Sequence, residues 1–240
     1  MRADEADTLA KWALDLGLPR GSVCLNVGSS TGRFRKVEQP HIHRAFIEPL
    51  EKAGIRFIHC DMKAADGVDE VGDILDPKFQ RRLQQHDANL LVCSNLLEHL
   101  TDPRAFAQAC GDLVPEGGYG LFSVPSSYPY HPDPIDTMLR PSPAELAAFL
   151  PGWTVVRSTE LEVGNYWQDL RRAGRPVLRL IRHAARVALP FYKPGKWREN
   201  ASRLSWLLRP YKVSIVLLRK GKAGKVTAAS GKRARQTSAA

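Results

Sequence analysis

Histidines and carboxylates in a proline-rich stretch are the residues of this chain best suited to chemistry. Residues 128–140 carry aromatic, imidazole and carboxylate groups between three prolines, and such stiffness lowers the entropic cost of holding reactive groups in place. His131 is the first candidate for a general base near neutral pH, and His99 is the second. The alternative is that His131 and Tyr130 only pack the loop. The candidate substrate-binding residues are Tyr128, Tyr130, Asp133, Asp136 and Arg140.

A glycine-bracketed turn is the second chemical feature, and it suits a nucleotide-bearing cofactor. Residues 23–27 are mostly apolar and lead into Gly28-Ser29-Ser30-Thr31-Gly32, after which a helix-compatible segment follows. Small residues let a ligand approach the backbone closely, and a helix start presents unpaired N–H groups. The alternative is that Gly28 and Gly32 are plain turn glycines.

Two carboxylates compete for the ribose hydroxyls of such a cofactor. Asp61 closes the apolar run 55–60, whereas Glu48 has the commoner spacing from the turn but lies inside a helix expected over 45–52. We favour Asp61, because a helix break at Pro40 would lengthen the connection to the second strand. The alternative for Glu48 is a solvated helix residue.

Strands that alternate with helices are expected to position these groups. The expected strands are 23–27, 55–60, 68–74, 88–93, 119–124, 153–163 and 211–218. This alternation predicts an α/β fold with a parallel, doubly wound sheet. Ligands of open α/β sheets bind beyond the carboxyl ends of the strands, which is where the glycine turn and Asp61 lie in this prediction.

The order of the motifs resembles class I S-adenosylmethionine-dependent methyltransferases over about residues 20–160. The resemblance rests on the glycine turn, Asp61, Asp73, the segment Ser94-Asn95-Leu96-Leu97-Glu98-His99-Leu100 and Pro115-Glu116-Gly117-Gly118. It implies a Rossmann-like, mostly parallel seven-stranded sheet with helices on both faces and an antiparallel final strand. It also implies S-adenosyl-L-methionine as the cofactor. Asn26 and Ser30 depart from the family pattern.

The same resemblance implies roles for individual residues. Asp73 would accept a hydrogen bond from the adenine amino group, with Ile74 against the ring, although a simple turn aspartate is the alternative for Asp73. Ser94 and Asn95 would line the cofactor. The complete expected cofactor set is Gly28, Ser29, Gly32, Asp61, Asp73, Ile74, Ser94 and Asn95, and no metal site is expected.

The expected reaction is in-line methyl transfer to a small-molecule or glycan acceptor, with a hydroxyl favoured. The glycan expectation comes from a looser resemblance of the 128–140 loop and the segment 95–99 to methyltransferases of polysaccharide biosynthesis. A nucleic-acid methyltransferase is an alternative, although Ser94-Asn95-Leu96-Leu97 lacks the Asn/Asp-Pro-Pro-aromatic pattern of base N-methylating enzymes. A non-catalytic binding protein with the same fold is another. A dehydrogenase is discounted, because Pro194 breaks the helix that Tyr192 and Lys196 would need.

Charge is distributed unevenly along the chain. The net charge is +10, yet residues 165–240 carry 19 Lys/Arg and only 2 Asp/Glu. We expect one domain over 1–220 with a basic helical insertion at about 165–208, and a disordered basic tail at 221–240. Within the insertion, residues 177–189 form a basic amphipathic helix suited to an anionic membrane surface, while nucleic acid is the less favoured partner. The alternative is a helix whose apolar face packs on the domain.

The expected compartment is the cytoplasm, with peripheral contact to the inner face of the membrane as a variant. The N-terminus lacks an apolar signal core, and no stretch approaches the ~20 apolar residues of a membrane span. Cys24, Cys60, Cys93 and Cys110 are scattered without metal spacing and are typical of reduced, buried thiols.

Overall fold

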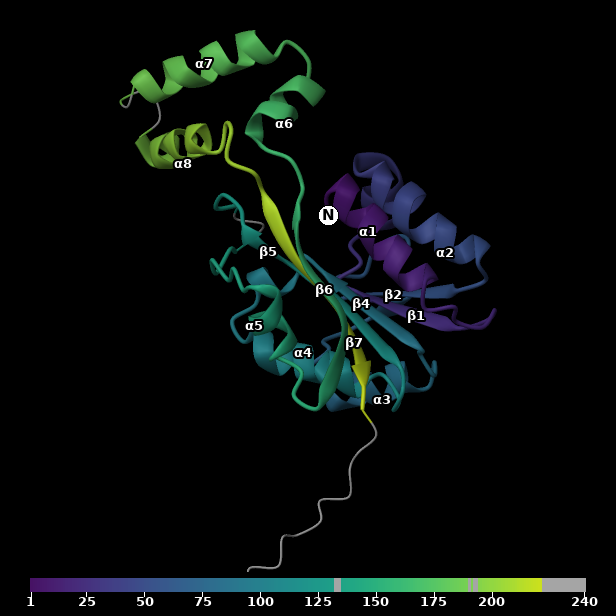
Figure 1. Ribbon diagram of the computed structural model, residues 1–240. Helices are drawn as coiled ribbons and strands as arrows, with labels where there is room; N and C mark the ends of the chain where they lie inside the picture. Colours follow the sequence, from purple (N-terminus) through teal and green to yellow (C-terminus); the bar gives the residue numbers. More distant parts are fainter. Residues whose placement is uncertain (132–134, 190, 192–193, 222–240) are drawn as a thin grey trace, which may run out of the picture.

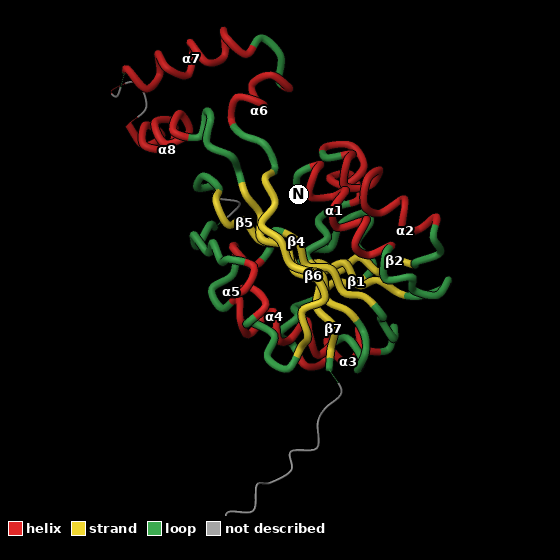
Figure 2. The backbone as a smooth tube through the Cα atoms, in the orientation of Figure 1, coloured by secondary structure: helices red, strands yellow, loops and turns green. Residues whose placement is uncertain are grey.

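A seven-stranded sheet forms the centre of the computed structural model, which describes residues 1–131, 135–189, 191 and 194–221. The strand order is β3-β2-β1-β4-β5-β7-β6. The strands are β1 (Val23–Val27), β2 (Arg56–Asp61), β3 (Glu70–Val71), β4 (Leu90–Ser94), β5 (Tyr119–Ser127), β6 (Trp153–Glu162) and β7 (Lys212–Lys220). Figure 2 shows the twisted sheet in yellow between red helices.

The directions of the strands confirm the predicted topology. β1 pairs in parallel with β2 and β4, and β4 pairs in parallel with β5. β7 is antiparallel to both β5 and β6. Because Val27 lies opposite both Cys60 and Cys93, the carboxyl ends of β1, β2 and β4 meet at one edge of the sheet. The strand ends that the sequence predicts to bind a ligand therefore lie side by side.

Helices cover both faces of the sheet, as predicted (Figure 1). One face carries α1 (Ala3–Leu14), η1 (Phe34–Glu38), η2 (Ile42–Ile47) and α2 (Glu48–Lys52). The other carries α3 (Pro77–Gln84), α4 (Pro103–Asp112) and α5 (Pro143–Ala147). Fully buried side chains such as Leu9 and Phe46 fill the first layer, and Leu83 and Phe122 fill the second. A short helix, η3 (Leu97–His99), follows β4.

Proline affects two element boundaries, one of which agrees with the sequence prediction and one of which does not. The expected helix break is present, because η1 ends at Glu38, η2 begins at Ile42 and Pro40 lies between them. The strand expected over 119–124 instead continues to Ser127. It passes Pro125 through a register shift against β7, which accommodates a residue without an N–H donor. The proline-rich loop therefore begins at Tyr128.

Three helices stand between β6 and β7, away from the sheet at the top of Figure 1. They are α6 (Tyr166–Arg172), α7 (Pro176–Ala188) and α8 (Pro194–Ser205). The apolar face of α7 is not packed on the domain, since Val177 and Ile181 are each 59% exposed. Within the described part of the chain, no helix is both long and apolar enough to cross a bilayer. Of the tail predicted at 221–240, residues 222–240 lie outside the described residues.

Candidate active site

The glycine turn after β1 has a backbone geometry that favours glycine at its first position. Gly28 has a φ of +69°, and a Cβ atom there would lie 2.7 Å from Cδ2 of Leu96. The backbone N–H groups of Gly28 and Ser29 both donate to the Cys60 carbonyl, at 2.9 and 3.0 Å. The turn is thereby fixed to the end of β2.

Asp61 lies beside this turn, and Glu48 does not share that position. The backbone N–H of Ser30 donates to Oδ2 of Asp61 at 2.9 Å. Glu48 begins α2 and forms an ion pair with Lys52 at 2.8 Å, which lowers the pKa of its carboxyl. Of the two candidate ribose ligands, Asp61 is thus the one in contact with the glycine turn.

Arg35 is a component of the turn that sequence reasoning missed. Its side chain is buried and donates to the carbonyls of Ser29 and Ser30 at 2.8 and 2.6 Å, and to that of Gly67 at 2.5 Å. Burial lowers the pKa of this guanidinium. Ser30, which departs from the family pattern, has a left-handed φ of +54°. Because arginines are usually solvated on helix surfaces, the sequence holds no signal for this role.

Glu5 of α1 is a second residue that sequence reasoning missed. Its carboxylate is fully buried and accepts from Asn95 Nδ2 at 2.7 Å, Ser123 Oγ at 2.6 Å and Ser94 Oγ at 3.3 Å. It therefore joins the carboxyl end of β4 to the middle of β5. The predicted cofactor residues Ser94 and Asn95 lie at the expected edge, with their polar groups already bonded to α1.

Two further predicted cofactor residues, Asp73 and Ile74, lie in the turn after β3, and Gly32 lies at the far end of the glycine turn. Asp73 is exposed, and its Oδ1 accepts from the backbone N–H of Leu75 at 2.9 Å. Ile74 is buried in the hydrophobic core. Gly32 donates its N–H to the Asp66 carbonyl at 2.7 Å, so the far end of the glycine turn also has a fixed partner.

The loop after β5 is organised around an ion pair. Asp136 has no exposed side-chain surface and accepts from Arg140 at 3.0 and 2.6 Å. Burial acts to raise the pKa of Asp136, but hydrogen bonds from Arg140, His131 and Met138 outweigh it and lower that pKa to about 2. The charged groups of these two predicted acceptor-binding residues are engaged with each other, so they fix the shape of the loop.

His131 is held by the same ion pair. Its backbone N–H donates to Asp136 Oδ2 at 3.0 Å, and its Nδ1 lies 3.2 Å from both Asp136 Oδ2 and the Pro129 carbonyl. Burial lowers the pKa of His131, which favours the neutral imidazole. With Nδ1–H as a donor, the lone pair lies on Nε2.

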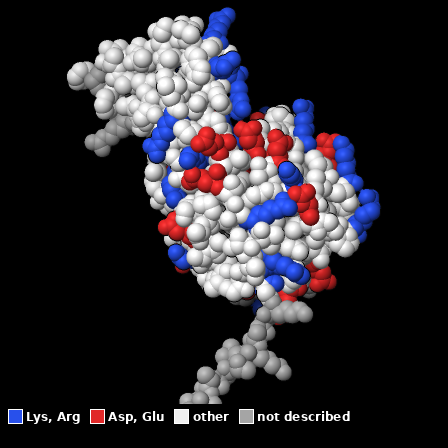
Figure 3. All heavy atoms as spheres, in the orientation of Figure 1, with Lys and Arg blue, Asp and Glu red and all other residues white. Residues whose placement is uncertain are grey.

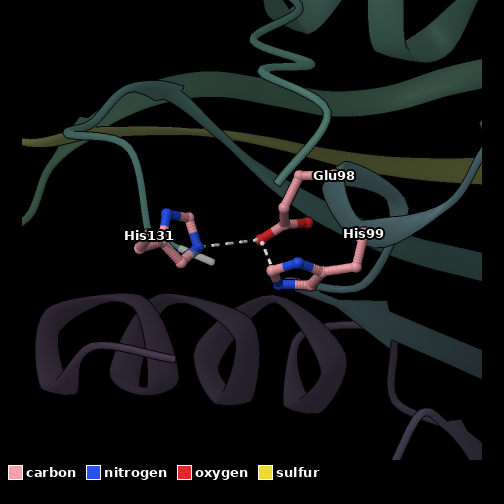
Figure 4. A group of neighbouring side chains, drawn as sticks. All are labelled: Glu98, His99 and His131. Atoms are coloured by element: carbon pink, nitrogen blue, oxygen red, sulfur yellow. Dashed lines mark ion pairs between the residues drawn. The ribbon is translucent and has the colours of Figure 1, made fainter. Parts of the chain in front are cut away.

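The two candidate bases meet at one carboxylate, Glu98 (Figure 4). Glu98 Oε1 lies 3.7 Å from His99 Nε2 and 3.9 Å from His131 Nε2. The Glu98 side chain is fully buried, and neither of its oxygens has a hydrogen-bond partner among the described residues. Burial raises the pKa of Glu98 to about 7. In the sequence, Glu98 stands out only as part of the segment 94–100.

Of the other predicted acceptor-binding residues, one is packed against His131, one is exposed and one is not described. Tyr128 packs edge-on against His131, with ring centroids 5.2 Å apart, and against Tyr211 at 4.6 Å. Tyr130 is 47% exposed at the surface of the loop. Asp133 lies outside the described residues. The described part of the loop thus places an aromatic wall and a Glu–His–His cluster beside the carboxyl end of β4.

Comparisons with known proteins identify relatives for part of the chain. No family model matches it. The curated relatives that match are ubiquinone biosynthesis O-methyltransferases. The one from Yersinia pestis is 30% identical over 77 residues, and the one from Klebsiella pneumoniae is 31% identical over 77 residues. These matches cover 32% of this chain and 29% of each relative, so the chain spans less than a third of the length of the curated relatives it matches.

Solved structures match over most of the chain. A protein assigned as a sarcosine dimethylglycine methyltransferase of Galdieria sulphuraria has a TM-score of 0.55 at 13% identity, covering 90% of this chain and 84% of that one. Coclaurine N-methyltransferase, bound to N-methylheliamine and S-adenosylhomocysteine, has a TM-score of 0.50 at 14% identity, covering 90% and 71%. The chain therefore has the Rossmann-like fold of S-adenosylmethionine-dependent methyltransferases.

Proposed function

We propose that this protein transfers a methyl group from S-adenosyl-L-methionine to a hydroxyl of a small-molecule or glycan acceptor. The observation that carries the proposal is the contact of the glycine turn with Asp61, through the hydrogen bond from Ser30 N–H, at the ligand-binding edge of a methyltransferase fold. A glycine turn lets the methionine part of the cofactor approach the backbone closely, and a carboxylate at the end of a strand can bind the ribose.

In this proposal the cofactor spans the carboxyl ends of β1 to β4. The turn from Gly28 to Gly32 contacts its methionine part, and Asp61 accepts hydrogen bonds from both ribose hydroxyls. Asp73 and Ile74 contact the adenine. Ser94 and Asn95 line the cofactor through their backbone, because their side chains are bonded to Glu5.

The chemistry is a single in-line displacement. The acceptor oxygen forms a bond to the methyl carbon while the carbon–sulfur bond breaks, and the electron pair of that bond stays on sulfur to give neutral S-adenosylhomocysteine. The hydroxyl proton must leave, and the neutral imidazole of His131 is suited to accept it at Nε2, with His99 as the second candidate. Asp136 acts as a positioning residue, since it holds His131 without facing the acceptor.

Oxygen rather than nitrogen as the methylated atom is favoured by two considerations. The curated relatives are O-methyltransferases, although the match covers only 77 residues. A hydroxyl acceptor also needs a general base more than an amine does. The cluster of Glu98, His99 and His131 provides groups that can accept its proton. The exposed Tyr130 at the mouth of the loop suits the stacking of a sugar or aromatic ring.

Methyl transfer is tested directly with methyl-tritiated S-adenosylmethionine and a panel of catechols, simple phenols and sugars. We expect tritium in at least one hydroxylated acceptor and none with Gly28→Val, whose added side chain would collide with Leu96. Circular dichroism checks that the variant is folded. Transfer by Gly28→Val at the wild-type rate would refute the cofactor position, and labelling of amines alone would refute the hydroxyl acceptor.

We also propose that α7 contacts an anionic membrane surface from the cytoplasmic side. Its apolar residues Val177, Ile181 and Leu189 are each 59% exposed. A cavity of about 620 Å³ on α6, α7 and α8 is lined by Arg175, Arg179, Arg182, Arg186 and Arg203, among others. Figure 3 shows this helical layer as largely white with blue side chains along one edge. Exposed apolar residues beside arginines suit insertion between anionic headgroups. Four buried, unpaired thiols support the reducing compartment.

Co-sedimentation with vesicles tests this contact. The protein should pellet with vesicles that contain phosphatidylglycerol at low salt, and less at 0.5 M salt. Ile181→Asp should weaken sedimentation at least tenfold, whereas Val37→Asp, at a site 67% exposed on η1, should not. No sedimentation at low salt, or a tighter affinity for RNA than for vesicles, would overturn the proposal.

A further inference from the structure

Glu98 poses an energetic problem that the proposed function leaves unexplained. Its carboxylate is fully buried, and neither oxygen accepts a hydrogen bond within the described residues. Leaving a buried polar group without a partner costs about 1–3 kcal/mol, and more for a charged one. Such a group in a folded protein calls for an explanation, and a bound ion is one of them.

The surroundings of Glu98 have the composition of a metal site. Glu98, His99 and His131 each offer one ligand atom, and the three atoms lie within 4.8 Å of one another. The distances from Oε1 to the two Nε2 atoms are 3.7 and 3.9 Å. Ligands that each lie about 2.0–2.2 Å from one ion are separated by roughly 3–4 Å, so a small contraction brings all three onto a single ion. Figure 4 shows both rings directed at the carboxylate.

The outer nitrogens of both imidazoles are held in the way that metal-binding histidines require. His99 Nδ1 is hydrogen-bonded to the Ile135 carbonyl, and His131 Nδ1 lies 3.2 Å from the Pro129 carbonyl and from Asp136 Oδ2. A ring that donates from Nδ1 carries its lone pair on Nε2, which is the atom that faces Glu98 in each case. This arrangement fixes the tautomer and increases the basicity of the ligand nitrogen.

We propose that Glu98, His99 and His131 bind one divalent transition-metal ion through Oε1 and the two Nε2 atoms. Two imidazoles and one carboxylate suit first-row ions such as Zn²⁺, Fe²⁺, Mn²⁺ or Co²⁺ better than Ca²⁺ or Mg²⁺. Three ligands from the chain leave positions free for an acceptor oxygen. The inference deepens the proposed methyl transfer and rests on it for its chemical purpose.

The ion changes how the acceptor hydroxyl is activated. Coordination polarises the hydroxyl, so its proton passes to water and the metal-bound oxygen attacks the methyl carbon. The carbon–sulfur bond then breaks with its electron pair on sulfur, as before. His131 Nε2 acts as a ligand instead of taking the proton, and no oxidant or reductant is needed. A five-coordinate ion with three ligands from the chain has two free positions, and the acceptor class that these select is a vicinal diol or catechol, with two neighbouring oxygens.

The test uses Co²⁺ as the probe, with tag-free full-length protein. We expect visible absorption bands of bound Co²⁺ that saturate at one ion per chain. Glu98→Gln, His99→Gln and His131→Gln should each weaken Co²⁺ binding at least 100-fold. Asp136→Asn, which loosens His131, should weaken it about 10- to 100-fold. His43→Gln, a histidine on η2 outside the cluster, should bind as the wild type does.

The outcomes separate this inference from the proposed function. Each variant is also titrated with S-adenosylhomocysteine, which checks folding and the cofactor site independently. Absence of Co²⁺ binding to the wild type, or unchanged binding by the three ligand variants, overturns the metal site even if methyl transfer occurs. Failure to bind the cofactor with intact Co²⁺ binding overturns the proposed function and leaves the metal site standing.

Discussion

At the scale of single residues, the contacts of Asp61 and Glu48 distinguish the two candidate ribose ligands. Asp61 bonds to the glycine turn through Ser30, while Glu48 pairs with Lys52 on a helix. Ser30 takes a left-handed backbone conformation at the position where the sequence departs from the family pattern. The identity of a residue was enough to nominate both carboxylates, but only their contacts distinguish them.

The ribose assignment predicts unequal effects for two charge-removing substitutions. Asp61→Asn should weaken binding of S-adenosylhomocysteine at least tenfold, because an amide can accept at only one atom where two ribose hydroxyls must donate. Glu48→Gln should leave the affinity unchanged. Calorimetric titration of both variants measures this, and a larger loss for Glu48→Gln would reverse the assignment.

Glu5 should be important for stability although it lies outside the motifs. Glu5→Leu leaves the side-chain donors of Ser94, Asn95 and Ser123 without their acceptor, so we expect a loss of about 3 kcal/mol in the free energy of unfolding. Asp7→Leu, on the exposed face of the same helix, is the control and should cost far less. Urea denaturation gives both values. Equal losses would show that the buried bonds contribute little.

His59 should make stability fall in mild acid. Burial lowers the pKa of His59 to about 4, and its Nδ1 accepts from Asn26 Nδ2 at 3.1 Å. Because this pKa lies below the unfolded value of about 6.5, the stabilisation is complete above pH 6.5. It is lost as pH falls towards 4, by up to about 1.4 kcal/mol per pH unit. Urea denaturation from pH 7.5 to 4.5 should show a shallower fall for His59→Gln. Parallel curves for variant and wild type would contradict this.

At the scale of elements, the sequence predicts the strands and helices well, because their periodicity is local. The buried runs that became β1, β2 and β4 were recognisable, as was the helix break at Pro40. The extension of β5 to Ser127 was not, since it depends on pairing with β7, far along the chain. The bonds from Glu5 to Ser94 and Ser123 join segments 89 and 118 residues apart, and no local pattern encodes them.

The helix that follows the Glu98–His99 segment has a cap whose contribution can be measured. Asp102 Oδ1 accepts from the backbone N–H of Ala105 at 3.0 Å at the start of α4. Asp102→Ala should lower the free energy of unfolding by about 0.5–2 kcal/mol. Asp112→Ala removes an acid from the opposite end of α4, where negative charge is unfavourable, and should cost nothing. Thermal and urea unfolding of the pair decide the point, and equal effects would contradict the capping role.

At the scale of the whole molecule, the candidate site and the excess of basic residues lie in different parts of the chain. The sheet and its helices carry the candidate site, while the basic helices α6 to α8 stand apart at one end (Figure 1). Composition alone located the basic part, because 19 of the 35 Lys/Arg residues fall in 165–240. Composition left open whether α7 packs on the sheet. The exposed Val177 and Ile181 show that this face of α7 does not pack on the sheet.

The central claim is that the glycine turn and Asp61 form a cofactor site, and cofactor binding tests it most directly. Calorimetric titration of the full-length chain with S-adenosylhomocysteine should give one site per chain with micromolar affinity, and Gly28→Val should abolish the heat while retaining the circular dichroism of the wild type. A folded wild-type protein that binds neither S-adenosylhomocysteine nor S-adenosylmethionine would contradict the claim and leave a binding protein that only shares the fold.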